Sequence, residues 1–215
     1  MKKAVGILAG VLLLIVAGFG LPSLFGTALS IQGSAETGLP YSIGSVSVNP
    51  FTGSASVSDV VLLTAEPFKG PYIARVGTIE ARFDASTLLS DFIVVNEVIV
   101  RNADIRVEQS GSRINIREVA ARFKDYLSTA DTTSGPRIFI HELRIEGARG
   151  SVATDAGSRE FQMTDLVLRD VGSESAGTPI QVLAGNVLEP IMLEALKDAG
   201  TSGLGDKLRD IFRRD

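Results

Sequence analysis

The sequence predicts an α+β fold dominated by β-structure. We expect a strongly twisted, mostly antiparallel sheet with bulged strands, helices packed on one side of it, and an N-terminal transmembrane helix. Two observations carry this prediction: an eight-residue strand pattern occurs four times, and an uncharged apolar segment opens the chain. Amphipathic segments between and after the patterned strands are the expected helices.

The strand pattern has apolar residues at its first, third, sixth and eighth positions and an acidic residue at its fifth. Its copies span residues 55–62, 93–100, 138–145 and 161–168. Alternation with a period of two is typical of a strand with one buried face. The spacing of three in the middle would turn the later residues to the other face. We therefore expect a β-bulge in each copy, which also bends the strand.

The opening segment is long enough to cross a membrane. Residues 4–25 carry no charge and would span about 33 Å as a helix, against a hydrocarbon core of about 30 Å. We predict a cytoplasmic stub over 1–3, a transmembrane helix over 4–28 and a linker over 29–40. Lys2 and Lys3 place the amino terminus in the cytoplasm by the positive-inside rule. The alternative is a signal peptide cleaved within 26–28 or 33–35, and either interpretation exports the main domain.

A hairpin and a third strand are expected next. Residues 41–48 alternate as a strand, and the Pro and Gly of residues 49–53 predict a turn into the first patterned copy. Residues 72–84 predict another strand. Residues 85–90 predict a short helix capped by Ser86.

Two segments of the chain repeat at a spacing of 45 residues. Residues 93–107 align with 138–152, each as a patterned strand, then an expected turn at Asn102-Ala103 or Gly147-Ala148, then a second strand. Apolar stripes predict helices over 115–127 and 178–199, the second kinked at Pro190. The main domain is expected over 41–200. A C-terminal tail over 201–215 carries apolar residues beside arginines, and its contacts stay open.

Composition narrows the function classes. The chain of 215 residues has a net charge of −4, no Cys, no Trp and one His. It therefore lacks the basic surface of a nucleic-acid-binding protein, and neither thiol chemistry nor a metal site is expected. The acids Asp59, Glu97, Glu142 and Asp165 recur with the strands, so we interpret them as bulge residues rather than as general acids and bases. We interpret His141 as a polar surface residue, and predict no enzyme activity, no catalytic residues and no cofactor.

The chain resembles the AsmA-like family of bacterial envelope proteins over about residues 1–130, with a looser likeness in 137–171. The matching segments are the apolar N-terminus, the turn 49–53, residues 58–62, 72–80 and 83–91, the strand 93–100 with a hairpin to Glu108, and Asn115-Ile116. The resemblance implies a short, single-pass inner-membrane member with a periplasmic domain that serves envelope lipid homeostasis or outer-membrane assembly. It implies no catalytic residues.

The apolar strand faces are the candidate binding surface. The residues expected to line a lipid groove are Ile93, Val95, Val98, Val100, Ile138, Ile140, Leu143 and Ile145. The partners this implies are the membrane, a phospholipid and an envelope protein. The other interpretation is that these side chains form a closed core under the helices. In that case the protein is a non-enzymatic interaction module that pairs with another envelope protein through a strand edge.

Overall fold

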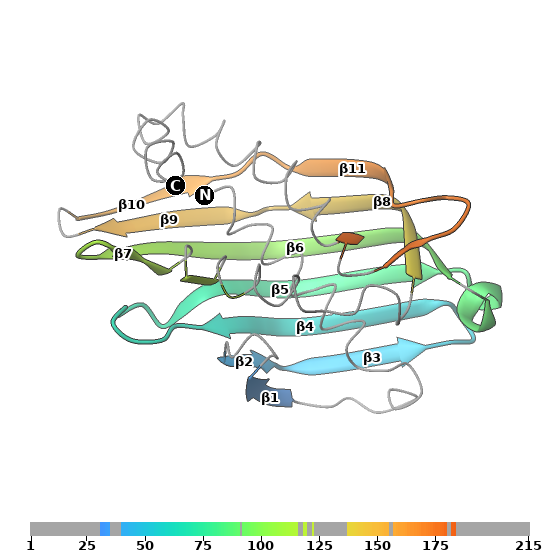
Figure 1. Cartoon of the computed structure of the whole chain (residues 1–215), viewed down its shortest axis with the longest axis horizontal. Coiled ribbons are helices and arrows are strands. Elements are labelled where there is room, and N and C mark those ends of the chain that lie inside the picture. Colours follow the sequence, from blue (N-terminus) through green and yellow to red (C-terminus); the bar gives the residue numbers. More distant parts are fainter. Residues whose placement is uncertain are drawn as a thin grey trace.

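The structure, a computed structural model, is built around one large sheet. It describes residues 31–34, 40–90, 92–115, 118–119, 122, 137–154, 157–179 and 182–183. Twelve strands join through hydrogen bonds, with the main order β1-β2-β4-β5-β6-β8-β11 (Figure 1). The β-dominated, mostly antiparallel part of the expected fold therefore agrees with the described strands.

The strands differ greatly in length, and β6 is the longest with 18 residues. Their bounds are β1 (Ile31–Ser34), β2 (Pro40–Ile43), β3 (Ser45–Asn49), β4 (Ser54–Leu63), β5 (Tyr72–Phe83), β6 (Ile93–Ser110), β7 (Arg113–Ile114), β8 (Arg137–Glu146), β9 (Arg149–Thr154), β10 (Gly157–Gln162), β11 (Leu166–Val171) and β12 (Thr178–Pro179). A short 3-10 helix, η2 (Ala85–Leu89), connects β5 to β6.

The repeat found in the sequence is built into the sheet as a parallel pair. Strand β6 lies antiparallel to β5 on one side and parallel to β8 and β9 on the other. Ile93 pairs with Ile138 and Glu108 pairs with Ala153, so each residue faces the one 45 positions later in the sequence. The two repeats therefore lie side by side without any offset.

A row of irregular residues crosses the sheet at right angles to the strands. Asp59, Asn102 and Gly147 have φ of 51°, 56° and 62°, and Gly77 on β5 lies between the first two. Pairing keeps one register on both sides of this row, from Ser58 with Thr78 to Val60 with Val76. We call Asp59, Gly77, Asn102 and Gly147 the transverse row. Neighbouring strands skip a residue together here, rather than one strand bulging against a regular partner.

The transverse row explains the spacing of three in the first copy of the sequence pattern, and the same spacing further along the neighbouring strands. Val57 and Val60 on β4 are both buried, as are Val76 and Ile79 on β5 and Val100 and Ala103 on β6. In an uninterrupted strand residues three apart point to opposite faces. The irregular residue between them returns the later one to the buried face, so these six residues of β4, β5 and β6 share one face.

Two expected turns do not reverse the direction of the chain. Asn102-Ala103 belongs to β6, which runs on to Ser110, so the predicted hairpin to Glu108 is wrong. Gly147-Ala148 joins β8 to β9, which continue in the same direction along β6. Asn and Gly favour the left-handed region both in turns and at irregular strand positions, which is why the sequence suggested a reversal of direction.

The start of η2 also differs from the expectation. Asp84, not Ser86, is the N-cap: its carboxylate accepts a hydrogen bond from the Ser86 amide at 2.9 Å. The Ser86 hydroxyl donates a second hydrogen bond to this carboxylate, and this bond first, with the one from the amide, lowers the pKa of Asp84 below its ordinary value.

The expectation of helices packed on one side of the sheet is not supported. Among the described residues, the helix whose bounds are defined is the five-residue η2. Thr178-Pro179, expected to open a helix, forms strand β12 against β8, since proline disfavours the helical region for the residue before it. Most of the expected helices over 115–127 and 178–199, and the tail over 201–215, lie outside the described residues.

The single-pass inner-membrane localisation is likewise not supported. No helix in the described part of the chain has the length and apolar character to span a bilayer. The expected span over 4–28 lies outside the described residues, and Ile31–Ser34, in the expected linker, forms strand β1.

Candidate functional site

Strands β6 and β8 place all eight groove candidates on one face, where each residue of β6 is paired with one of β8. Ile93 pairs with Ile138, Val95 with Ile140, Val98 with Leu143, and Val100 with Ile145. The face continues along β6 through Ala103, Ile105 and Val107, which are also buried. The result is one apolar face that follows the length of the longest strand.

A bulge within β6 keeps the first half of this face aligned with the second. Arg82 on β5 pairs with Glu97, whereas the next residue, Phe83, pairs with Val95, so Asn96 is the extra residue. This confirms the predicted bulge in the second copy of the pattern. On β8, Ile140 and Leu143 are both buried around the exposed His141.

The candidate face is covered in this structure. Six of the eight side chains are buried, with Ile140 only 1% exposed, while Ile93 and Val98 are half-buried and pack against the same cluster. Val119 and Leu183, which follow β7 and β12 in the chain, belong to the same core and are 1% and 0% exposed. An acyl chain would reach this face only after such contacts had been displaced.

The opposite face carries an ordered set of charges that the sequence analysis missed. Arg101 on β6 bonds Glu80 on β5 at 2.7 Å and Glu146 on β8 at 3.1 Å. Arg144 reaches Glu97 at 2.9 Å. We call this set of eight side chains the outer-face lattice: Glu80, Arg82, Glu97, Arg101, Glu142, Arg144, Glu146 and Arg169.

The lattice accounts for two of the four recurring acids. Glu142 accepts hydrogen bonds from Arg144 and, at 3.1 Å, from Arg169. These hydrogen bonds, Arg144 first, hold the pKa of Glu142 below its ordinary value. In return, hydrogen bonding by Glu142 raises the pKa of Arg144. A carboxylate held in its charged form by two arginines is poorly suited to act as a general acid near neutral pH.

The other two recurring acids have different positions. Asp59 adopts the left-handed conformation in the transverse row, with Arg75 3.8 Å away and both side chains largely exposed. Asp165 lies between β10 and β11 and accepts a hydrogen bond from the Gly147 amide at 2.9 Å. The bulge predicted at each acid is therefore absent at Asp59, where neighbouring strands skip a residue together, and at Asp165, because residues 161–168 are divided between β10 and β11. Glu97 and Glu142 are instead half-buried ion-pair partners.

His141 lies on the surface of β8, as predicted. Its ring meets Phe139 edge-on with ring centres 4.8 Å apart, and its Nδ1 lies 3.7 Å from an Asp170 carboxylate oxygen.

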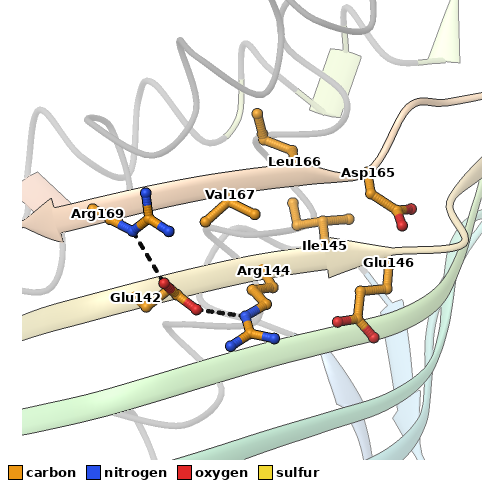
Figure 2. Close-up of a pocket in the computed structure, with 8 residues that line it drawn as sticks. All are labelled: Glu142, Arg144, Ile145, Glu146, Asp165, Leu166, Val167 and Arg169. Carbon is orange, nitrogen blue, oxygen red and sulfur yellow. Dashed lines mark hydrogen bonds and ion pairs between the residues drawn. The ribbon is translucent and has the colours of Figure 1, made fainter.

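A hollow of about 400 Å³ opens between β8 and β11 on the outer face (Figure 2). Figure 2 shows Glu142 between Arg144 and Arg169. The Glu142 carboxylate is hydrogen-bonded to both arginines, so these charged groups are paired with each other within the hollow. Within the described ranges, no group of three acidic or His side chains is placed to hold a metal ion.

Comparison with protein-family models finds no match, and comparison with curated proteins finds none either. The resemblance to the AsmA-like family therefore stays a prediction from the sequence.

The sequence did contain a signal for the outer-face lattice. Arginine and glutamate occupy alternate positions on β8, at Glu142, Arg144 and Glu146, opposite Glu97 and Arg101 on β6. Arg101 faces Glu146, whereas Glu97 faces Glu142 and is reached by Arg144 from two residues further along β8. These relations become visible only when the two repeats are aligned as neighbours. The sequence analysis treated them as similar but separate segments.

Proposed function

We propose that this protein shields lipid acyl chains along the apolar face of its sheet, in the service of envelope lipid homeostasis or assembly as the family resemblance implies. The observation that carries the proposal is the continuity of that face. It follows β6 from Ile93 to Val107, or about 50 Å at 3.3 Å per residue. One leaflet of hydrocarbon is about 15 Å thick, half of a 30 Å core, so the face is long enough for an acyl chain.

The separation of the two faces supports the same proposal. Charged residues gather in the outer-face lattice, while the inner face of β6 and its neighbours is aliphatic. Burial of methylene groups on such a face is favourable by about 0.8 kcal/mol each. Lipid entry requires the covering contacts of Val119 and Leu183 to yield, because the face is buried without lipid.

The burial itself favours a second candidate. A face that is already filled is the core of a non-enzymatic interaction module. Such a module pairs with another envelope protein through a strand edge. Within the described strands, β11 pairs only with β8 and so offers such an edge, with Val167 45% exposed. The positive φ of Asp170 interrupts that edge and limits the length over which a partner strand can pair.

Lipid analysis of the purified protein separates the two candidates. Native mass spectrometry of detergent-free protein should detect bound phospholipid, and the protein should take up a fluorescent lipid. Val98→Asp, a charge on the half-buried part of the face, should abolish both. Val167→Asp, a charge on the outer face, should leave both unchanged. Circular dichroism must show that the two variants fold equally, and Val98→Ser serves as a milder variant if Val98→Asp does not fold.

Wild-type protein that carries no lipid and takes up none would remove the proposal and leave the interaction module. Uptake that is unaffected in both folded variants would place the lipid on another surface.

A further inference from the structure

The turn between β3 and β4 holds a fully exposed aromatic side chain. Phe51 is 96% exposed, by far the highest value among the large exposed apolar residues of the described chain. The others, Leu63, Val167 and Val182, lie between 37% and 45%. A single exposed apolar side chain is common on protein surfaces, so the argument for a partner rests on how the ring of Phe51 is held and where it lies.

The turn is fixed in place rather than left loose. The Asn49 side-chain oxygen accepts hydrogen bonds from the amides of Phe51 at 3.0 Å and Thr52 at 3.1 Å. Gly53 adopts a φ of 62°, and its carbonyl accepts a hydrogen bond from the Phe83 amide at 2.8 Å. These contacts attach the turn to the end of β5 and present the ring in a defined position.

The position of the turn relates it to the apolar face. Phe83, bonded to Gly53, pairs with Val95, and the Asp84 amide donates to the Val94 carbonyl at 2.9 Å. Phe51 therefore lies at the same end of the sheet as the start of β6, where the apolar face begins with Ile93 and Ile138. Figure 1 shows the β3–β4 connection beside η2 at this end.

The chemistry of the turn favours a lipid surface as the partner. Residues 49–54 contain no charged side chain, only an amide, two hydroxyls, proline, glycine and the phenyl ring. Aromatic rings with uncharged polar neighbours suit the boundary between headgroups and acyl chains. A specific protein interface normally surrounds its aromatic anchor with further contacts. Here the ring stands alone on a hairpin.

We infer that the β3–β4 turn docks on a lipid surface, with Phe51 inserted into the headgroup boundary, and brings the adjoining end of the apolar face to the bilayer. This inference rests on the proposed function, because docking there serves the movement of acyl chains to and from the face. A single ring gives a weak, reversible contact, which suits repeated transfer.

The absence of tryptophan from the chain makes a direct test simple. Phe51→Trp introduces the sole tryptophan, and its emission should shift to the blue on addition of phosphatidylcholine vesicles. Brominated phosphatidylcholine should then quench it. Val167→Trp is the matched control on the outer face of β11 and should show neither effect. An emission of Phe51→Trp that is unchanged by vesicles, or that changes only when another protein is added, overturns the inference.

A second variant measures the consequence for transfer. Phe51→Ser should slow the movement of a fluorescent lipid from vesicles to the protein by about tenfold, given the free energy of burying one aromatic side chain. Its melting temperature and its equilibrium lipid occupancy should match the wild type, since the ring is exposed in the folded state. Full occupancy with an unchanged transfer rate overturns the inference and spares the proposed function. If Phe51→Trp docks on vesicles but the protein never binds lipid, the proposed function is overturned and the docking of the turn remains.

Discussion

Asn102 departs from extended backbone geometry inside β6 without ending the strand. It holds a φ of 56° in the middle of the strand, and its equivalent in the second repeat is Gly147, with a φ of 62°. Gly77 on the neighbouring strand makes room for it, because a Cβ there would lie 3.1 Å from the Asn102 Cβ. Both repeats thus use a residue type that tolerates the left-handed region at the same point of the sheet.

Replacement of Asn102 by a β-branched residue should destabilise the fold. Asn102→Val should lower the free energy of unfolding by about 1–2 kcal/mol, the usual cost of the left-handed conformation for such a residue. Urea denaturation measures this loss. Asn102→Gly is the matched control and should be as stable as the wild type or nearly so. Equal stability of the two variants would mean that the conformation is not strained for valine here.

Gly150 is required for another reason, the approach of an aromatic ring. It pairs with Phe161 across β9 and β10, and a Cβ at Gly150 would lie 2.2 Å from the Phe161 ring. In the first repeat the equivalent position is Ile105, which is buried itself. The second repeat therefore fills the same place with a ring from the next strand.

Gly150→Ala should cost about 1–3 kcal/mol of stability, as an overpacked site does. The Phe161→Ala background supplies the control. There the same Gly150→Ala change should cost much less, because the ring that it strikes is gone. Thermal unfolding of the four proteins of this cycle gives the coupling energy. Additive effects would show that the ring is not the obstacle.

At the scale of elements, the loop between β4 and β5 is held by one carboxylate. Glu108, 8% exposed on β6, accepts hydrogen bonds from the amides of Lys69 at 2.6 Å and Gly70 at 2.7 Å. Asn115 accepts one from the Glu108 amide at 2.9 Å and donates one to the Arg106 carbonyl. The loop and the chain after β7 are thus tied to the same end of β6.

Glu108→Gln should release this loop. The amide side chain offers one oxygen where two are needed, and its NH₂ group would face a backbone N–H. We expect a loss of about 1–3 kcal/mol, with faster hydrogen exchange at the Lys69 and Gly70 amides. Glu66→Gln, in the exposed part of the same loop, is the control and should change neither quantity. Unaltered protection at Gly70 in the Glu108 variant would refute the role of the carboxylate.

The outer-face lattice should make stability depend on acid pH through Glu142. The pKa of this side chain is lowered in the folded protein. Its stabilising contribution is therefore complete above the ordinary value of about 4.5 and is lost as pH falls through the lowered folded value. The melting temperature of Glu142→Gln should be below that of the wild type at pH 7, and the two should converge under acid conditions. Glu160→Gln on exposed β10 should show no such convergence.

The apolar face could be predicted from the sequence, but the course of the strands past Asn102 and Gly147 and the charged residues of the opposite face could not. Period-two alternation with one spacing of three located the buried residues of β4, β6 and β8 correctly, because burial depends on local geometry. It did not reveal that the chain runs on in the same direction past Asn102, within β6, and past Gly147, between β8 and β9, since turns favour the same residues. It also missed the outer-face lattice, because the partners of Glu97 and Glu142 come from strands distant in sequence.

At the scale of the whole molecule, the repeat determines the centre of the sheet. Two segments of similar pattern, 45 residues apart, pair in parallel and combine their apolar faces into one. Parallel neighbours need a long connection between them, and residues 111–136 provide it. The sequence predicted a mostly antiparallel sheet and gave no sign that the two repeats would pair with each other in parallel.

This arrangement predicts which backbone amides are most protected from hydrogen exchange. Strand β6 has hydrogen-bonded neighbours along both sides, β5 on one and β8 with β9 on the other, whereas β1 and β11 each have one neighbouring strand among the described residues. Amides of β6 between Val98 and Val107 should therefore exchange most slowly, at rates that follow global unfolding. Those of β11 should exchange through local opening. Hydrogen exchange followed by NMR measures both, and the Asn102→Val variant should accelerate β6 by the same free energy that it removes from global stability. Equal protection of β11 and β6 would mean that the sheet opens as one unit and that β6 is not its most stable part.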